Sequence, residues 1–472
     1  MKRSNILWIM TDQHRFDALS CMGGLPGMTP NLDALAEEGV VFENCYTPSP
    51  VCGPARTALK SGRFPAACGA VKNWLPCHSP DWLPERLTNV GYDTGMAGKL
   101  HISPCEKSYG FRWKVLSDAP YSVYADDDKH SEYIKWLTEK RNGESLVPMF
   151  DADELAYKDD LYRFCAGSGF RTVEEHETGW TSNQFFKYLE ERQKEKPFFF
   201  FLSYFGPHQP YLPPKPYDSW VSSEEIELPQ SYYDDLMKDH PIFEKTARTL
   251  RERVKSELTE QQVKELLAQY YGQVKMIDES IGEVVKRLKE DGLYDDTTII
   301  FTADHGDHLS QYGLFFKSQM YDSCCKVPLI IKPAHSHLSY RNKQVVNSLD
   351  LYGTILDIAA DANWKQPDVE AGSLFELLTH KSEEKGETYS IFGADKNHAL
   401  SMFRKAEWKL IRLADGNETD AVYELYNLEQ NPEETENLYP KCKDAEWCKD
   451  LKQQLDDWFL IQYKRYPEKT TI

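Results

Sequence analysis

Three short apolar runs constrain the fold most, because each has the length of one strand and is hydrophobic on both faces. They are Asn5–Met10, Pro197–Tyr204, which contains four consecutive phenylalanines, and Thr297–Thr302. A strand with one face in water alternates polar and apolar residues, whereas an uninterrupted run predicts a strand covered on both sides. The chain therefore predicts an α/β fold with a largely parallel central sheet.

Amphipathic segments and shorter apolar runs lie between these strands. The helices expected from their spacing and end signals are Leu32–Glu38, Trp82–Val90, Thr181–Arg192 and Glu260–Asp291. The further strands expected are Val40–Asn44, Tyr92–Met96 and Val327–Lys332. Residues 105–180 and 215–260 have weak periodicity, so we expect long irregular loops there that shape a substrate cleft.

The pattern changes after residue 385, and a chain of 472 residues favours two domains. Short strands separated by turns are followed by one helix: Tyr389–Phe392, Ala399–Phe403, Trp408–Leu413, Ala421–Asn427 and the helix Trp447–Tyr463. The sequence predicts a large domain over 1–385 and a smaller one over 386–472, made of an antiparallel sheet and a closing helix.

The formal net charge is -20, with 75 acidic against 55 basic side chains. Such a surface disfavours nucleic acid and anionic membranes as partners. An anion site in this chain must therefore gather its cations locally, which is possible because salt screens charges over roughly 8–10 Å.

The eleven cysteines are an odd number without the spacing of a disulfide scaffold, so we expect most to be reduced. Cys442 and Cys448 are close enough to pair in an oxidising compartment. The apolar run after Met1-Lys2-Arg3 is too short for a signal-peptide core, and no stretch has the length of a membrane span. These features predict a cytoplasmic protein, or a periplasmic one if a signal peptide was removed.

Polar side chains follow the predicted strands at their carboxyl ends, where ligands bind in open α/β sheets. Asp12 ends the first strand, and Asp304 and His305 follow the strand at 297–302. Two carboxylates with one imidazole suit a hard divalent cation such as calcium, magnesium or manganese. Lys99 and His101 follow another strand, and on an extended backbone residues two apart point the same way.

The run from Cys52 to Arg63 reads Cys-Gly-Pro-Ala-Arg-Thr-Ala-Leu-Lys-Ser-Gly-Arg. No helix breaker occurs between Thr57 and Gly62, so we place Cys52 at a helix N-terminus, which favours negative charge. The run resembles the C-x-P-x-R…L-x-x-G-R signature of the type I sulfatases, in which the cysteine is oxidised to formylglycine. The resemblance implies the three-layer α/β/α sandwich of the alkaline phosphatase superfamily, with a smaller C-terminal antiparallel sheet and helix.

In that family calcium is bound by positions that correspond here to Asp12, Gln13, Asp304, His305 and the formylglycine at Cys52. The sequence departs at Gln13, where many sulfatases have a second aspartate, so one negative charge is lost and manganese or magnesium stays an alternative. Asp12-Gln13 resembles the choline-sulfatase and phosphonate monoester hydrolase branch and some bacterial polysaccharide sulfatases.

The resemblance also implies roles for the remaining polar residues. Lys99 and Lys317 bind the sulfate oxygens, His208 beside Lys317 protonates the leaving alcohol, and His101 acts as a base. Arg56 holds the formylglycine, and Asn73 lies twenty-one residues after Cys52, a spacing that resembles a substrate-binding asparagine of the choline-sulfatase branch. Four further residues are candidates either for a saccharide subsite or for ordinary surface positions: His14, Arg15, Lys72 and His78.

The resemblance predicts a sulfuric ester hydrolase that desulfates a saccharide, with a uronic acid 2-O-sulfate of a glycosaminoglycan oligosaccharide as the expected substrate. Its protein partner would be the enzyme that generates formylglycine, and the oligomeric state is left open. The alternatives are a phosphonate monoester or phosphodiester hydrolase, a choline-sulfatase, and an unmodified, inactive protein that binds sulfated glycans.

Overall fold

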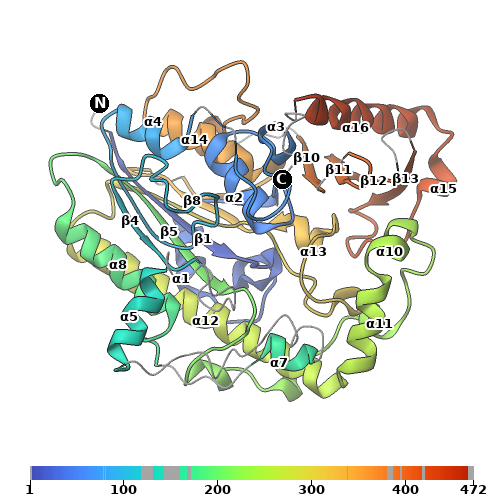
Figure 1. The fold of residues 1–472 in the computed structure, drawn as a ribbon, viewed down its shortest axis with the longest axis horizontal. Helices are drawn as coiled ribbons and strands as arrows, with labels where there is room; N and C mark the ends of the chain where they lie inside the picture. Colours follow the sequence, from blue (N-terminus) through green and yellow to red (C-terminus); the bar gives the residue numbers. More distant parts are fainter. Residues whose placement is uncertain are drawn as a thin grey trace.

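The structure is a computed structural model that describes residues 3–77, 79, 81–118, 131–142, 160–166, 172–336, 338–379, 386–393, 396–416 and 420–465. Within these residues a nine-stranded mixed sheet lies between two layers of helices, and a separate four-stranded sheet lies to one side (Figure 1). The predicted α/β fold with a second, antiparallel sheet is confirmed.

The strands of the large sheet run in the order β4–β3–β5–β1–β6–β8–β2–β7, with β9 paired to β2. Their bounds are Asn5–Asp12 (β1), Val40–Tyr46 (β2), Asp93–Gly98 (β3), Trp113–Leu116 (β4), Phe198–Pro207 (β5), Thr297–Ala303 (β6), Lys326–Val327 (β7), Leu329–Lys332 (β8) and Tyr340–Asn347 (β9). The three apolar runs form the centre, because β1 lies parallel between β5 and β6, and every residue of these strands is buried. The sheet is mixed because β8 runs antiparallel to β6 and to β2.

Alternate residues of the central strands pack into different helix layers. Leu7 and Phe200 contact the layer formed by α1 (Pro30–Glu37), α8 (Glu177–Glu191) and α12 (Glu260–Glu290). Trp8 and Phe201 contact the opposite layer, formed by α2 (Cys52–Ser61), α4 (Leu83–Asn89) and α14 (Leu351–Ile358). Both faces are thus filled by apolar side chains, which accounts for the uninterrupted hydrophobic runs.

The two segments expected to be loops contain regular elements. These are β4 and the helices α5 (Glu132–Lys140), α7 (Leu161–Cys165), α9 (Gln230–Tyr233), α10 (Pro241–Thr246) and α11 (Arg248–Glu257). They were missed because β4 and most of the helices are short, and because α11 buries only Arg251 and Val254 along a highly charged sequence. Residues 119–130, 143–159 and 167–171 of the first segment lie outside the described residues. The remaining short helices are α3 (Pro65–Cys68), α13 (Asp322–Cys325) and α15 (Tyr439–Cys442).

The second sheet is antiparallel in the order β10 (Glu387–Phe392), β11 (Leu400–Lys405), β12 (Trp408–Ala414) and β13 (Ala421–Asn427). The closing helix α16 (Glu446–Lys464) packs on one face through Leu455, against Phe403 and Leu410. The other face packs against the large part of the molecule, where Tyr426 joins a cluster with Tyr321. The division at residue 386 follows the undescribed residues 380–385 and stays a prediction.

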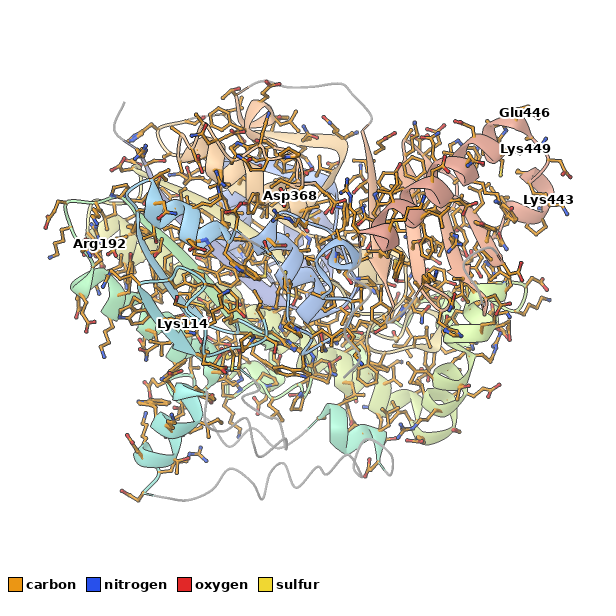
Figure 2. The ribbon with its side chains drawn as sticks, turned by 45° about the horizontal axis from the view of Figure 1, so that its top comes forward. Lys114, Arg192, Asp368, Lys443, Glu446 and Lys449 are labelled. Atoms are coloured by element: carbon orange, nitrogen blue, oxygen red, sulfur yellow. The ribbon has the colours of Figure 1, made fainter. Side chains whose placement is uncertain are left out.

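Charged side chains between α15 and the first turn of α16, among them Lys443, Glu446 and Lys449, project into solvent (Figure 2). Within the described ranges, no helix combines the length and the apolar character that a membrane crossing requires. All eleven cysteines are described and all are free thiols, including Cys442 and Cys448.

Candidate active site

The ends of the central strands bring the predicted side chains into one cluster. Asp12 ends β1, Asp304 and His305 follow β6, and Cys52 is the first residue of α2. Each of these four residues offers one ligand atom, and the four atoms all lie within 4.8 Å of one another in the interior. The structure therefore gathers two carboxylates, an imidazole and the cysteine at the carboxyl edge of the sheet.

Arg56 connects residues at or near the carboxyl ends of four strands. Its Nε donates to Asp304 Oδ2 at 2.7 Å, and its Nη2 donates to Asp12 Oδ2 at 3.2 Å. Its Nη1 donates to the Lys99 carbonyl oxygen at 2.7 Å and to Ser203 Oγ at 2.8 Å. The guanidinium is fully buried, so its loss would leave two buried carboxylates with less compensating charge. Arg56 positions the cluster.

Two lysines bond to residues at the end of β1. Lys99 Nζ lies 2.5 Å from Asp12 Oδ2, and Lys317 Nζ donates to Gln13 Oε1 at 2.6 Å. The Gln13 amide nitrogen donates to Gln209 Oε1 at 2.8 Å and also to Asp307. Gln13 therefore links Lys317 to a second buried carboxylate, and its predicted role as a metal ligand stays a prediction.

Unpaired acceptors in the cluster fit a divalent cation. Asp12 Oδ1 and His305 Nε2 are buried without a hydrogen-bond partner among the described residues. His305 Nδ1 lies 2.9 Å from the Gly306 carbonyl oxygen, which makes Nδ1 the donor and leaves a lone pair on Nε2. That Nε2 lies 3.9 Å from Asp12 Oδ1 and 3.7 Å from Asp304 Oδ1. Buried acceptors that face one another without a donor are costly, and a cation between them would remove the cost.

The surroundings of Cys52 favour negative charge. Burial alone would raise the pKa of its thiol, but the charges of Lys317 and Lys99 hold that pKa well below its ordinary value. The sulfur also lies at the N-terminus of α2, where backbone N–H groups are free of helical partners. The position of Cys52 is therefore buried and electropositive, which suits an anionic group.

His208 follows β5 and lies beside Cys52. Its Nδ1 lies 2.6 Å from the Gln209 carbonyl oxygen, so Nδ1 is the donor and Nε2 faces away from the backbone. Burial, together with the charge of Lys317, lowers the pKa of His208 to about 4. The ring is neutral at pH 7 in the absence of a bound anion.

The expectation of an extended backbone from Lys99 to His101 is wrong. His101 has a φ of 51°, and Gly98 has a φ of 98°, so the chain turns at the end of β3. Asp118 holds this turn, because its Oδ1 accepts from the backbone N–H groups of Leu100 at 2.7 Å and His101 at 3.0 Å. Both ring nitrogens of His101 are buried without a hydrogen-bond partner among the described residues. The ring neighbours Cys52 and contributes to lowering the pKa of its thiol.

Asn73 lies beside the start of α2, and its predicted role in substrate binding stays a prediction. Its Oδ1 accepts from the N–H of Gly53, the residue directly after Cys52, at 2.9 Å.

Sequence reasoning missed Asp118, which falls in the segment expected to be a loop. It also gave no role to Asp307, whose Oδ1 accepts from the backbone N–H groups of Leu309 at 2.7 Å and Phe316 at 3.0 Å. Asp307 lies three residues after Asp304 in the sequence, but no local pattern indicated that its carboxylate accepts from these backbone N–H groups.

The structure describes three of the four candidate subsite residues. His14 is buried, with Nδ1 3.2 Å from Thr11 Oγ1 and its ring against Phe301. Arg15 is held by an ion pair with Asp17 at 2.6 Å. Lys72 is exposed, and His78 lies outside the described residues.

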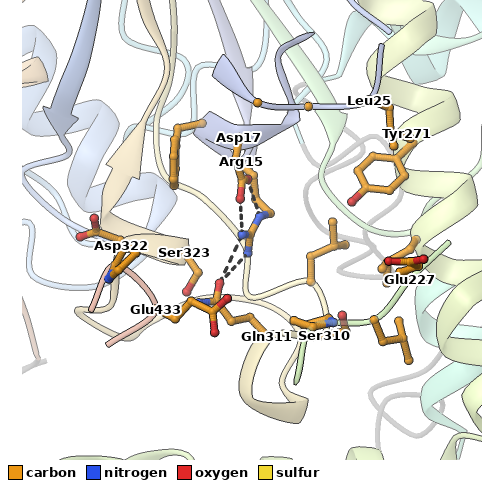
Figure 3. A pocket seen from close by; sticks show the side chains of 18 residues that line it. Arg15, Asp17, Leu25, Glu227, Tyr271, Ser310, Gln311, Asp322, Ser323 and Glu433 are labelled. Atoms are coloured by element: carbon orange, nitrogen blue, oxygen red, sulfur yellow. Dashed lines mark hydrogen bonds and ion pairs between the residues drawn. The ribbon is translucent and has the colours of Figure 1, made fainter. Parts of the chain in front are cut away.

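A pocket of about 540 Å³ is lined in part by Arg15, Tyr271 and Gln311 (Figure 3). Its lining includes the carboxylates of Asp17, Glu227, Asp322 and Glu433. None of the predicted catalytic side chains lines this pocket, and its acidity disfavours a sulfate ester.

The fold and the cluster together define an α/β protein with two carboxylates, an imidazole, a cysteine and two lysines at the carboxyl ends of its central strands. The sulfatase family model matches residues 4–362, and a model for the C-terminal part of N-sulphoglucosamine sulphohydrolase matches residues 310–459. The chain belongs to the sulfatase family, and is accordingly a sulfuric ester hydrolase.

Relatives and solved structures extend this finding. The chain is 28% identical to an arylsulfatase of Clostridium perfringens over 92% of this chain and 90% of that protein. It is 24% identical to an N-acetylglucosamine-6-O-sulfatase of Bacteroides thetaiotaomicron over 97% of this chain and 86% of that protein. A phosphonate monoester hydrolase of Agrobacterium radiobacter has the same fold, with a TM-score of 0.78, 21% identity, and coverage of 98% of this chain and 96% of the other.

Proposed function

We propose that this protein removes sulfate from a sulfated saccharide, with a formylglycine made from Cys52 as its nucleophile. The observation that carries the proposal is the cluster at the start of α2, where Cys52 lies within 4.8 Å of ligand atoms of Asp12, Asp304 and His305, and where Lys99 and Lys317 bond to Asp12 and Gln13. The full-length similarity to an N-acetylglucosamine-6-O-sulfatase favours a sugar alcohol as the leaving group. A uronic acid 2-O-sulfate of a glycosaminoglycan stays the specific candidate.

The cations of the site suit a sulfate monoester. Lys99 and Lys317 approach the cluster from different strand ends, so each would offset charge on a different sulfate oxygen. A divalent cation held by Asp12, Asp304 and His305 would add Lewis-acid stabilisation of the same group. The proposed ion is calcium, with manganese and magnesium as alternatives, because the donor set suits all three.

In this proposal Cys52 is the precursor of the formylglycine aldehyde, and its thiol does not itself react with the substrate. When hydrated, formylglycine would offer two hydroxyl groups: one would attack sulfur as the alcohol leaves, and deprotonation of the other would break the C–O bond to the sulfate, release sulfate and restore the aldehyde. His101, with two unpaired ring nitrogens beside this position, would take that second proton. A formylglycine-generating enzyme is the partner that this proposal requires.

His208 would protonate the departing alcohol. Its pKa is about 4 in the free protein, so it needs a bound anion to hold a proton at neutral pH. A sulfate ester beside the ring supplies that negative charge and raises the pKa of the imidazole. Binding of the substrate would thus favour the protonated form of His208, which can then act as the general acid.

The rival reaction is hydrolysis of a phosphonate monoester, which the fold also accommodates. The test is kcat/KM on 4-nitrophenyl sulfate and on a 4-nitrophenyl phosphonate monoester, measured with protein coexpressed with the maturation enzyme. We expect the sulfate to be preferred. A preference for the phosphonate would replace the proposed function by the rival, and no turnover of either ester would favour an inactive glycan-binding protein.

A further inference from the structure

Trp74 lies at the rim of the catalytic cluster with much of its indole in solvent. Its exposed fraction is 45%, which places it among the few exposed large apolar side chains of the described residues. The indole packs against the ring of His101, with centroids 4.5 Å apart and planes inclined by 42°. One side of the indole thus covers a predicted catalytic base, and the remainder faces outward.

The backbone of this loop is fixed to the nucleophile position. The Gly53 N–H donates to Asn73 Oδ1 at 2.9 Å, and a Cβ added at Gly53 would lie 2.8 Å from that oxygen and 3.2 Å from Asn73 Cα. The loop that precedes α4 therefore touches the first turn of α2, so Trp74 is placed relative to Cys52 by direct contact.

Trp74 also adopts an unfavourable backbone conformation. Its φ is 67°, in the left-handed region that bulky residues rarely occupy. Such a conformation persists only where the surroundings enforce it, and it is concentrated at ligand sites. Here it turns a large apolar side chain toward solvent at the entrance to the catalytic cluster, where the protein core gains little from it.

We propose that the outer part of Trp74 is the platform on which the ring of the substrate alcohol packs, which makes Trp74 a specificity-determining residue. This inference rests on the proposed sulfatase function. With the sulfate group of the ester bound beside Cys52, the alcohol part of the ester extends past His101 toward Trp74. The C–H groups of a pyranose ring pack well on an indole, whereas water covers it poorly.

The charges nearby favour a neutral or anionic ring over a quaternary ammonium group such as choline. Recognition of a quaternary ammonium uses a cage of several aromatic faces without competing cations. Lys99 and Lys317 stand in the cluster, and Lys72 is exposed two residues before Trp74. These cations would repel a cationic alcohol and would tolerate a sugar.

The experiment compares two primary alkyl esters, methyl glucopyranoside 6-sulfate and ethyl sulfate, which differ in the presence of a ring. Sulfate release gives kcat/KM for the wild type, Trp74→Ala and Trp74→Phe. Trp447→Ala is the matched control, because Trp447 is 41% exposed and packs on Trp408 at 4.4 Å at the start of α16.

Trp74→Ala should lose about tenfold in kcat/KM on the glucoside ester, the size of one ring-stacking contact, and less than twofold on ethyl sulfate. Trp74→Phe should recover most of the loss, and Trp447→Ala should behave as the wild type. Equal losses on both esters would mean that Trp74 acts only by holding His101, which overturns the inference.

The rates of the wild type on the three sulfate esters separate failure of the ring platform from failure of the proposed function. If the wild type cleaves 4-nitrophenyl sulfate but hydrolyses the glucoside ester no faster than ethyl sulfate, the ring platform is refuted and the proposed function stands. If it hydrolyses no sulfate ester at all, the proposed function fails and the inference fails with it.

Discussion

At the scale of single residues, the site depends on side chains that hold one another in place. Arg56 alone bonds to groups from the ends of four strands, and Asp12 contacts both Arg56 and Lys99. The sequence could predict these residues because each follows a strand end or belongs to the Cys52 run. It could not predict that Lys317 bonds to Gln13 or that Asp118 holds the turn at His101, since those contacts join distant segments.

His208 is predicted to act on the leaving group. Nitrophenolate departs without a proton and a sugar alkoxide does not, so His208→Ala should lose roughly two to four orders of magnitude in kcat/KM on a saccharide sulfate and far less on nitrophenyl sulfate. Lys99→Ala should impair both, because Lys99 contacts the common sulfate group. The measurement is the ratio of the two efficiencies in each variant, and equal losses in His208→Ala would make His208 a sulfate ligand.

The metal cluster gives a second residue-scale prediction. Removing Asp304 takes away a buried carboxylate that faces Asp12 and His305, so Asp304→Ala should bind no divalent ion. Chelation of the wild type should abolish turnover, and calcium or manganese should restore it. Metal content by elemental analysis, before and after dialysis, is the measurement. Full activity in a metal-free wild type would refute the cation site.

At the scale of elements, fully buried strands were predictable and lightly packed elements were not. β1, β5 and β6 are buried throughout and mostly apolar, because both of their faces are covered. α10 has six residues, and α11 is mostly charged, so neither shows a clear apolar period. Their positions depend on contacts with distant segments, such as the Tyr312 carbonyl oxygen that accepts from Arg251, and a local pattern does not contain these contacts.

The end of β3 gives an element-scale prediction. Gly98 has a φ of 98°, and a Cβ there would overlap the Ser203 carbonyl oxygen, which accepts from the Lys99 N–H at 2.9 Å. Gly98→Ala should therefore separate β3 from β5, lower the unfolding free energy by on the order of 3 kcal/mol and displace Lys99. Guanidinium unfolding and kcat/KM are the measurements.

Gly292→Ala is the control for that variant, because Gly292 has a φ of 68° and open space around its Cβ position. It should cost about 1 kcal/mol and leave kcat/KM unchanged. If both variants lose the same stability and Gly98→Ala keeps full activity, the close contact between β3 and β5 does not position Lys99.

At the scale of the whole molecule, the small sheet is fastened to the large part by buried polar contacts. Glu424 on β13 accepts from the Ile242 N–H at 2.7 Å through Oε1 and from the Tyr321 hydroxyl at 2.9 Å through Oε2. His240 precedes α10 beside this junction and stacks on Tyr426, with centroids 5.9 Å apart and planes within 8°. The two sheets should therefore unfold together.

This junction predicts a pH dependence of stability. Burial lowers the pKa of His240 from 6.5 to about 4. Between these values the unfolded chain binds a proton that the folded chain does not, so stability present above pH 6.5 is lost as the pH falls toward 4. His240→Phe should reduce the loss between pH 7.5 and 4.5 by on the order of 2 kcal/mol. Urea unfolding at both pH values measures this change. An unchanged difference between the two pH values would contradict the burial of a neutral His240.

The central claim is that Cys52 becomes formylglycine and that the converted protein is the sulfatase. Mass spectrometry of the peptide containing Cys52 gives the converted fraction in preparations made with and without the maturation enzyme, and kcat on nitrophenyl sulfate is measured on the same samples. The account predicts that kcat rises in proportion to the converted fraction and is absent in Cys52→Ala. Full activity in a preparation whose Cys52 is entirely an unmodified thiol would contradict it.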